Sequence, residues 1–310
     1  MAARITESEW IWRDGEFVRW EDATVHVLST AVQFGTSLFE GIRAYETPRG
    51  PAIFRLREHI RRLFDSSKIY RMVPPQSPDE VFEACVEVVR RNGLGSCYIR
   101  PMVVRGYGIA GLHAADGPLH TYVSAWSWGT YLGAEALEQG VNACTSSWSR
   151  AAPNTFPTLA KSAGHYNSSQ LMKAEAVVNG YDEAIGLGPS GLVSEGSGQN
   201  IFGVRDGVLF TPVLDGTSLA GITRDAVLQM AEEHGIEVQE RLVAREALYT
   251  ADELFFCGTA SEITPIRSVD RILVGNGTPG PVTRELQHAF FALVRGEVED
   301  TYGWLTHVEP

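Results

Sequence analysis

The amino-acid sequence predicts an α+β fold divided into two domains. Residues 1–126 contain a hairpin pattern, two amphipathic helices and two strand patterns, which together make a complete α+β unit. The segment 127–133 then contains two glycines and two large aromatic residues, and a second set of strands and helices follows it. A chain of 310 residues is long enough for two ordinary domains. We therefore expect a small N-terminal α/β domain at 1–126, an inter-domain linker at 127–136 and a larger C-terminal domain at 137–310.

The elements of the N-terminal domain follow from turn and capping residues. Asp14-Gly15 between two alternating runs predicts a hairpin at 10–18. A mixed region at 25–45 precedes a helix near 56–71, whose inward stripe contains Ile60, Leu63, Phe64 and Ser67. Ser77 and Pro78 begin a second helix, which ends at Asn92-Gly93 and directs inward Val81, Phe82, Cys85, Val88 and Val89. Strands are expected at 97–104 and 120–126.

The C-terminal domain is predicted to combine glycine-turned hairpins with helices. Gly186 to Gly191 matches the G-x-G-x-x-G pattern of dinucleotide-binding loops, but Pro189 and a further strand stand where that fingerprint requires a helix. We therefore expect a glycine-rich hairpin there, and a second hairpin at 200–211 turned at Asp206-Gly207. A helix at 221–235 follows with Thr223 as its N-cap, then a strand at 253–258 and a last helix that begins at Pro281.

Composition excludes several classes of protein. A hydrophobic content of 44% with 21% charged residues is typical of a soluble globular chain. The net charge of −12 argues against non-specific binding to nucleic acid or to anionic membranes. We expect no transmembrane helix and no signal peptide, because no apolar run approaches about 18 residues and the N-terminus lacks an apolar core. The four cysteines have no C-x-x-C spacing, which favours single buried thiols in a reducing cytoplasm.

The lysines are few enough to be considered one by one. Of 26 basic residues, three are lysines (68, 161 and 173), so the other 23 are arginines. Lys68 and Lys173 fall on polar faces of predicted helices, where a solvated side chain is the ordinary interpretation. Lys161 instead follows Pro157 and precedes Ser-Ala-Gly, small residues that let another group approach closely. Because only lysine has an amine that can lose its proton and attack a carbonyl, Lys161 is a candidate nucleophile, with a structural lysine as the alternative.

Other features fit the same kind of site. The helix that starts at Gly221 presents backbone N–H groups and a positive dipole, which suit an anion, although a simply capped surface helix is the alternative. Acidic residues lie in glycine-rich turns, and the linker contains Trp128 and Tyr131, which suggests that it lies against a ligand. An amine, an anion site and a carboxylate are what a pyridoxal phosphate enzyme requires.

Six motifs resemble those of bacterial branched-chain amino acid aminotransferases, which are fold-type IV pyridoxal phosphate enzymes. The match runs nearly from end to end, and it is most specific at residues 35–43, 98–101, 147–155, 194–198, 221–225 and 258–265. The resemblance implies a small α/β domain, a larger domain with a pseudo-β-barrel core, and pyridoxal 5'-phosphate between the domains.

The resemblance also implies roles for individual residues toward the cofactor. Lys161 would form the Schiff base and move a proton between the substrate α-carbon and the cofactor's C4′. Glu195 would pair with the pyridine nitrogen, Tyr166 would bond to the ring oxygen, and Leu219 would pack on the ring. The phosphate would be held by Arg62, Gly221, Ile222, Thr223 and Thr259.

The substrate pocket is implied in the same way. Tyr98 and the backbone of Thr259 and Ala260 would hold the α-carboxylate. Arg100 would receive the distal carboxylate of glutamate, with a strand-end salt bridge as its structural alternative. The apolar slot for aliphatic side chains would be lined by Phe39, Trp128, Tyr131 and Ala260, and Gly41 belongs to the same substrate-binding set.

Three departures from the family pattern concern the substrate. Phe34 replaces a tyrosine that supports Arg100, the loop 105–112 differs from the common one, and Gln199 replaces a glutamate. Phe34 and Leu112 are expected to complete a neighbour's site, so the chain should form at least a homodimer.

The predicted reaction moves the amino group of L-leucine, L-isoleucine or L-valine to 2-oxoglutarate by ping-pong chemistry, with glutamate and 2-oxo acids as the other ligands. A same-fold D-amino acid or R-selective amine transaminase is the nearest alternative. A lyase acting on chorismate-derived substrates is a more distant same-fold alternative. A catalytically silent cofactor-binding protein and a cofactor-free scaffold are the alternatives from other classes.

Overall fold

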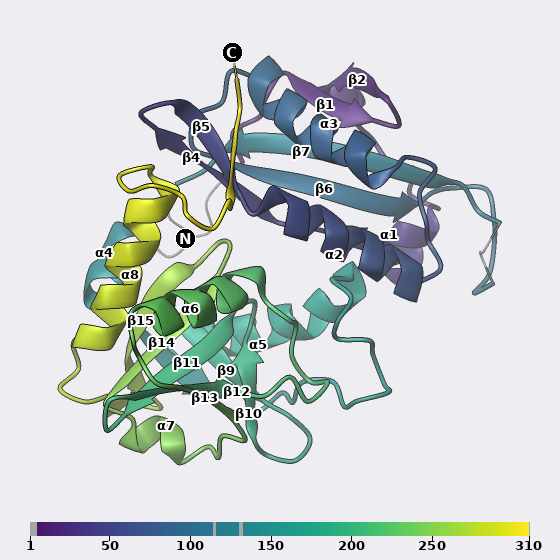
Figure 1. The fold of residues 1–310 in the computed structure, drawn as a ribbon. Helices are drawn as coiled ribbons and strands as arrows, with labels where there is room; N and C mark the ends of the chain where they lie inside the picture. The colour runs from purple at the N-terminus through teal and green to yellow at the C-terminus, as the bar shows by residue number, and fades with distance from the viewer. Residues whose placement is uncertain (1–4, 114–115, 130–132, 310) are drawn as a thin grey trace. The chain divides into compact units, whose positions relative to one another are not determined.

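The computed structural model describes residues 5–113, 116–129 and 133–309, and these divide into two compact units (Figure 1). Unit 1 takes the described residues of Met1–Gly129, Ala160–Gly164 and Leu293–Pro310, and unit 2 takes those of Thr130–Leu159 and His165–Ala292. The division differs from the expected C-terminal domain at 137–310, because two later segments join unit 1. Hydrogen bonds explain both exceptions: Leu305 pairs with Phe54 of the unit 1 sheet, and the backbone of Lys161 bonds to unit 1 elements.

Unit 1 is built on one antiparallel sheet whose strands differ in length. The described residues form eight strands in the order β17-β5-β4-β6-β7-β1-β2, with β3 paired to β6. Their bounds are β1 Trp10–Arg13, β2 Glu16–Arg19, β3 Ser37–Phe39, β4 Ile42–Thr47, β5 Gly50–Phe54, β6 Cys97–Arg105, β7 Leu119–Ser127 and β17 Leu305–His307. The predicted first hairpin is confirmed, since Asp14 and Gly15 both adopt positive φ angles (52° and 106°) between β1 and β2.

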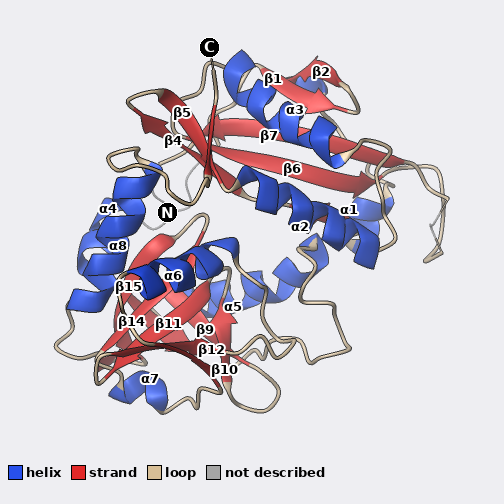
Figure 2. Cartoon of the chain, viewed as in Figure 1, coloured by secondary structure: helices blue, strands red, loops and turns tan. Residues whose placement is uncertain are grey.

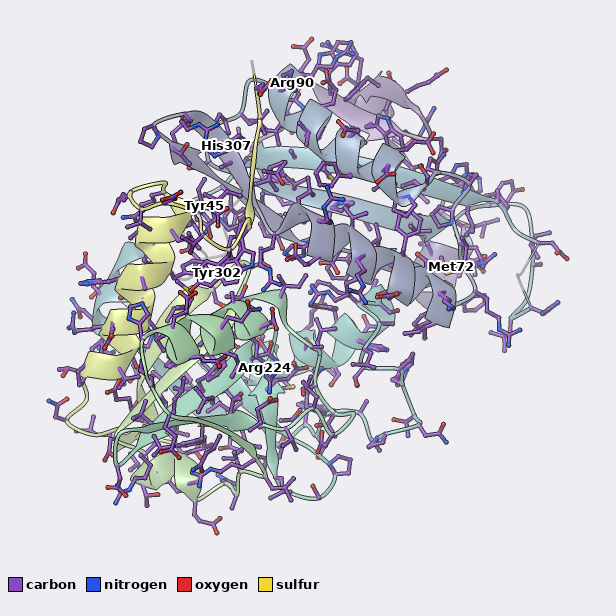
Figure 3. The ribbon with its side chains drawn as sticks, in the orientation of Figure 1. Tyr45, Met72, Arg90, Arg224, Tyr302 and His307 are labelled. Atoms are coloured by element: carbon purple, nitrogen blue, oxygen red, sulfur yellow. The ribbon has the colours of Figure 1, made fainter. Side chains whose placement is uncertain are left out.

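Two long helices cover one face of this sheet, as Figure 2 shows. They are α2 Leu56–Ile69 and α3 Pro78–Arg91, and shorter elements are α1 Thr30–Phe34 and the 3-10 turn Trp20–Asp22. The predicted start of α3 is confirmed, because Ser77 and Glu80 form a reciprocal capping box and Pro78 opens the helix. The core between helices and sheet includes Leu63, Val81, Cys85, Ile99, Val103, Val123 and Met72, the last of which is labelled in Figure 3.

Unit 2 contains a curled sheet with helices around it (Figure 2). Among its described residues the strand order is β10-β9-β8-β15-β14-β11-β12-β13, with β16 paired to β15. The bounds are β8 Val141–Thr145, β9 Glu183–Leu187, β10 Val193–Gly196, β11 Asn200–Arg205, β12 Val208–Pro212, β13 Val238–Arg241, β14 Glu253–Gly258, β15 Glu262–Val269 and β16 Ile272–Leu273. Both predicted hairpins are confirmed: β9 and β10 pair antiparallel, as do β11 and β12 around Asp206-Gly207.

The helices of this half are α4 Ala134–Gln139, the 3-10 turn Ala163–His165, α5 Tyr166–Val178, α6 Ile222–Glu233, α7 Ala247–Thr250 and α8 Pro281–Val294. The expectation that Thr223 caps α6 is wrong. Gly221 is the N-cap, with an extended backbone (φ −72°, ψ 134°), and Thr223 is already the second helical residue. Arg224, labelled in Figure 3, fixes α6 by donating to the carbonyl of Pro212 and pairing with Glu240.

Three other expectations can be compared with the structure. All four cysteines are free and buried, and burial raises the pKa of Cys97 to about 12, so these thiols are inert. Lys68 is exposed on α2, as predicted. Lys173 is not simply solvated, because its Nζ lies 3.0 Å from Oε2 of Glu183, a carboxylate with no exposed side-chain surface. None of the helices in the described part of the chain has the length and apolar content to cross a bilayer.

Candidate active site

The face of the unit 1 sheet opposite its hydrophobic core carries an aromatic cluster. Along β6, Ile99 points into the core, so its neighbours Tyr98 and Arg100 point to the opposite face. Trp126 on β7 lies directly opposite Tyr98 in the strand register and therefore shares that face. The Tyr98 ring centroid lies 5.2 Å from that of Trp126 and 5.3 Å from that of Trp128. Strand alternation thus places these aromatic rings together on the face away from the core.

Arg100 lies among these rings. Its Cζ lies 4.7 Å from the ring centroid of Phe39, 5.3 Å from that of Tyr98 and 5.8 Å from that of Trp126, which are distances of cation–π contacts. No ion pair forms with Arg100 in the described part of the chain, so the strand-end salt bridge considered from the sequence is absent there. Within the same residues, Nε of Arg100 and the indole N–H groups of Trp126 and Trp128 are buried without an acceptor. Buried donors of this kind suit an acidic ligand.

Gly41 makes room for Tyr98. A Cβ atom added at Gly41 would lie 1.8 Å from the hydroxyl oxygen of Tyr98, which is much closer than any real contact. Gly41 therefore permits the orientation of the Tyr98 side chain at the end of β3.

Lys161 is held to unit 1 through its backbone. Its N–H donates to Oγ of Ser66 on α2 at 3.0 Å, and its carbonyl accepts from the N–H of Phe39 at 3.1 Å. An antiparallel bridge between Leu38 and Ser162 continues the pairing. The Nζ atom lies 5.2 Å from the centroid of the Phe39 ring. The lysine amine therefore lies against the same phenylalanine that contacts Arg100.

A buried charge cluster adjoins this region. Glu40 has no exposed side-chain surface, and its two oxygens accept from Nε and Nη2 of Arg62 at 2.7 and 2.8 Å. His59 Nδ1 lies 2.7 Å from Oε2 of Glu40. Burial by itself raises the pKa of Glu40, but the Arg62 charge and the hydrogen bonds from Arg62 and His59 outweigh burial and hold it well below its ordinary value. Burial also lowers the pKa of His59, so its neutral ring donates from Nδ1 to an ionised carboxylate.

In unit 2, Glu195 is the centre of a second cluster. It lies on β10, is 6% exposed and forms an ion pair with Arg150. Its other oxygen accepts from the backbone N–H of Leu219 at 3.1 Å and from the Asn200 amide at 3.3 Å. The Asn200 amide also donates to the carbonyl of Leu219 at 3.0 Å. These bonds fix the carboxylate relative to the segment that leads into α6.

The start of α6 retains the features of an anion site. Gly221 supplies no side-chain oxygen to the first-turn N–H groups, and Ile222 and Thr223 are buried in that turn. A Cβ atom on Gly221 would lie 2.0 Å from Oδ1 of Asn200, so only glycine fits beside the amide that bonds to Glu195. Helix-start N–H groups and the helix dipole together favour a bound anion.

The remaining predicted site residues lie in separate turns, loops and helices. Thr259 and Ala260 are half-buried in the turn between β14 and β15, and Tyr166 is the half-buried first residue of α5. Phe34 at the end of α1 is 50% exposed, and Leu112 is 88% exposed. Tyr131 lies outside the described residues.

No pattern in the sequence singles out Glu40, Arg150 or Ser66 as functional residues. Glu40 and Arg150 both lie inside matched motifs, and each is a charged residue in an apolar or small-residue context. That pattern is the signal that could have indicated a buried ion pair.

Comparisons with known proteins show the family to which the chain belongs. The amino-transferase class IV family matches the chain over residues 37–269. The branched-chain-amino-acid aminotransferase of Escherichia coli (strain K12) is 55% identical over 303 residues, which cover 97% of this chain and 98% of that protein. The crystal structure of the Escherichia coli enzyme has a TM-score of 0.95 at 55% identity, covering 98% of this chain and 100% of that one.

A further solved structure is the branched-chain aminotransferase of the thermophilic archaeon Thermoproteus uzoniensis with norvaline. It has a TM-score of 0.93 at 40% identity, and the match covers 97% of this chain and 100% of that one. The chain therefore belongs to the amino-transferase class IV family and, within it, to the branched-chain-amino-acid aminotransferases of fold type IV.

Proposed function

We propose that this aminotransferase transfers the amino group of L-leucine, L-isoleucine or L-valine to 2-oxoglutarate in two half-reactions, with pyridoxal 5'-phosphate as cofactor. The proposal rests above all on the unit 1 sheet face, where an aromatic lining and buried donors without a described acceptor lie beside Lys161. Such a surface offers apolar contact to an aliphatic side chain and hydrogen-bond donors to a carboxylate.

The Glu195 carboxylate and the backbone N–H groups at the start of α6, both in unit 2, suit the cofactor. A buried, arginine-paired carboxylate at Glu195 is the partner that a protonated ring nitrogen requires, and the α6 start suits a phosphate. When bound, pyridoxal phosphate supplies an electrophilic aldehyde carbon and a ring that withdraws electrons. Leu219 would contact the ring, and its N–H keeps the Glu195 carboxylate in place. Tyr166 would donate to the ring oxygen, and Ile222, Thr223 and Thr259 would donate to the phosphate.

In unit 1, Arg62 and Lys161 would act on the same cofactor. Both Nε and Nη2 of Arg62 already bond to Glu40, which orients the guanidinium plane, and the positive charge of Arg62 suits a phosphate. Lys161 would hold the cofactor through Nζ at its aldehyde carbon, and the same amine would serve as the acid and base that moves a proton between the substrate α-carbon and the cofactor's C4′.

Two kinds of side chain must fit one pocket. The rings of Phe39 and Tyr98 offer an apolar surface to leucine, whereas Arg100 offers charge to the distal carboxylate of glutamate. The cation–π contacts stabilise the guanidinium when an aliphatic substrate supplies no carboxylate. Tyr98 and the Thr259–Ala260 backbone would hold the α-carboxylate that both substrates share.

We also propose a homo-oligomer of at least two chains. Phe34 and Leu112 are both exposed apolar side chains in unit 1, which suits residues that complete a neighbour's site. Phe34 has no hydroxyl to support Arg100, and this departure favours a D-amino acid or R-selective amine transaminase as the second candidate function.

Half-reactions followed by cofactor absorbance test the proposal. The purified protein with pyridoxal phosphate is mixed separately with L-leucine, D-alanine and R-1-phenylethylamine. We expect L-leucine to convert the bound cofactor to its amine form fastest, and 2-oxoglutarate to reverse the conversion. Failure with L-leucine together with conversion by D-alanine or R-1-phenylethylamine would favour the second candidate.

A pair of lysine variants tests the assignment of the amine. Lys161→Ala should abolish turnover while the protein remains folded by circular dichroism, whereas Lys68→Ala, at an exposed position on α2, should retain it. Normal turnover of Lys161→Ala would overturn the assignment.

A further inference from the structure

Lys161 lies in a segment whose flanking residues belong to the other unit. Residues 160–164 are part of unit 1, while Leu159 and His165 belong to unit 2. Because the segment is short, hydrogen bonds to neighbouring elements must hold it in place. In the described structure its backbone is anchored on one side by β3, through the Phe39 N–H and the Leu38–Ser162 bridge, and on the other side by α2, through Ser66.

The Ser66 hydroxyl forms the anchor on α2 both as a hydrogen-bond donor and as an acceptor. Its side chain is fully buried, at 0% exposure. The Oγ donates to the backbone carbonyl of Arg62 at 2.8 Å and accepts from the N–H of Lys161 at 3.0 Å. The bond to Arg62 fixes the direction of the hydroxyl proton, which leaves the oxygen lone pairs directed at Lys161. One buried hydroxyl therefore connects the backbones of the two residues.

We propose that Ser66 is a positioning residue, whose hydroxyl sets the backbone of Lys161 relative to Arg62 one helical turn away. The inference rests on the proposed function, in which Arg62 holds the cofactor's phosphate and Lys161 attaches to its aldehyde carbon. These two groups must be a fixed distance apart, because both bind one rigid ring. The Ser66 hydroxyl fixes the separation of the two main-chain positions from which these side chains extend.

Removing the hydroxyl should move Lys161 without removing any group that contacts the ligand. In Ser66→Ala the Lys161 N–H loses its acceptor at a partly buried position, and loss of a hydrogen-bond partner there is unfavourable. The segment then relaxes toward another acceptor, while the β3 anchor keeps it attached. A shift of the reacting atoms by about 1 Å can reduce a rate about a hundredfold.

The neighbouring serine offers a matched control. Ser67 is also on α2 and is also 0% exposed, but its Oγ has no hydrogen-bond partner among the described residues. Replacing either serine by alanine removes the same oxygen atom from the same helix. Ser66→Ala and Ser67→Ala therefore differ in the bonds to Arg62 and Lys161 and in little else.

The experiment compares wild type, Ser66→Ala and Ser67→Ala as holoenzymes. For Ser66→Ala we expect kcat with L-leucine to fall by about tenfold to a hundredfold, with KM within about threefold of wild type. We expect Ser67→Ala to stay within about twofold in both constants. The second readout is the pH midpoint at which the absorbance of the bound cofactor changes, which reports the proton at Lys161 Nζ. It should shift in Ser66→Ala and stay fixed in Ser67→Ala.

A third variant covers the case in which alanine perturbs the fold. Ser66→Thr keeps a hydroxyl that can bond to the carbonyl four residues earlier in a helix, so its kcat should exceed that of Ser66→Ala by about fivefold or more. The proposal is overturned if Ser66→Ala matches Ser67→Ala in kcat and in pH midpoint, or if threonine restores nothing. If wild type itself shows neither bound-cofactor absorbance nor turnover, the proposed function fails instead.

Discussion

Replacement of Glu40 by glutamine should destabilise the protein more than any surface charge change of the same kind. The carboxylate is fully buried and accepts two hydrogen bonds from Arg62 and one from His59 at 2.7–2.8 Å. Glutamine keeps the shape and one acceptor oxygen, but its NH₂ group must face a donor of Arg62 or His59. His59 can change tautomer, whereas Arg62 has only donors.

The magnitude follows from the bonds that weaken. Loss of the carboxylate charge costs each Arg62 bond about 1 kcal/mol, because charge-assisted bonds contribute about 1.5–3 kcal/mol and neutral ones about 0.5–1.5. The NH₂ group of the glutamine, a buried donor that faces a second donor, adds about 1–3 kcal/mol to the loss of stability. We therefore expect the free energy of unfolding to fall by about 3–5 kcal/mol, which agrees with the cost of breaking a buried ion pair.

Urea unfolding of the cofactor-free protein measures this change, with fluorescence and circular dichroism as independent probes. Glu58→Gln is the control, because Glu58 is 37% exposed and makes one 2.9 Å bond with Arg55. It should cost less than about 1 kcal/mol. If Glu40→Gln loses no more stability than Glu58→Gln, the buried cluster does not stabilise the fold as described.

Three further predictions concern the two units separately. In Gly221→Ala the new Cβ would displace the Asn200 amide from Glu195 and Leu219, so the Kd for pyridoxal phosphate should rise about tenfold or more, whereas Gly198→Ala, which enters open space, should leave it unchanged. Arg100→Ala should reduce kcat/KM about a hundredfold for glutamate and about tenfold or less for L-leucine; equal losses would exclude a role for Arg100 in separating the two substrates. Burial, assisted by the charge of Arg150, lowers the pKa of His165 to about 4 from 6.5, so between these pH values the unfolded chain binds a proton that the native protein does not. Stability should therefore fall as pH decreases from 6.5 to 4, and His165→Asn should show a shallower fall in urea midpoints over that range.

Local signals in the sequence predict the elements well. Asp14-Gly15 and Asp206-Gly207 specify hairpin turns through the positive φ angles they tolerate, and Ser77 with Glu80 specifies a helix start. Each of these signals acts over four residues or fewer. The error at Thr223 arises from the same kind of rule, because a threonine side chain can accept from first-turn N–H groups and glycine has no side chain to do so. The helix nevertheless begins two residues earlier than a threonine cap allows, after a glycine that fits beside Asn200.

The hydrogen bonds that assemble the site join residues that lie far apart in the sequence. Arg62 bonds to Glu40 across 22 positions, Arg150 to Glu195 across 45, and Ser66 to Lys161 across 95. No spacing rule relates residues so far apart, so the sequence could propose Arg62, Glu195 and Lys161 only through motifs. It could not supply the partners that orient them. The same holds for Lys173, whose buried partner Glu183 comes from a strand beyond the end of its own helix.

The C-terminal strand has a consequence for synthesis of the chain. β17 covers β5, which would otherwise be the edge of the unit 1 sheet. Because β17 follows β5 by some 250 residues, β5 remains an open edge while those residues are translated, and an open edge can pair with another nascent chain. A chain truncated before Leu305 should aggregate during expression even if all the residues around Lys161 are intact.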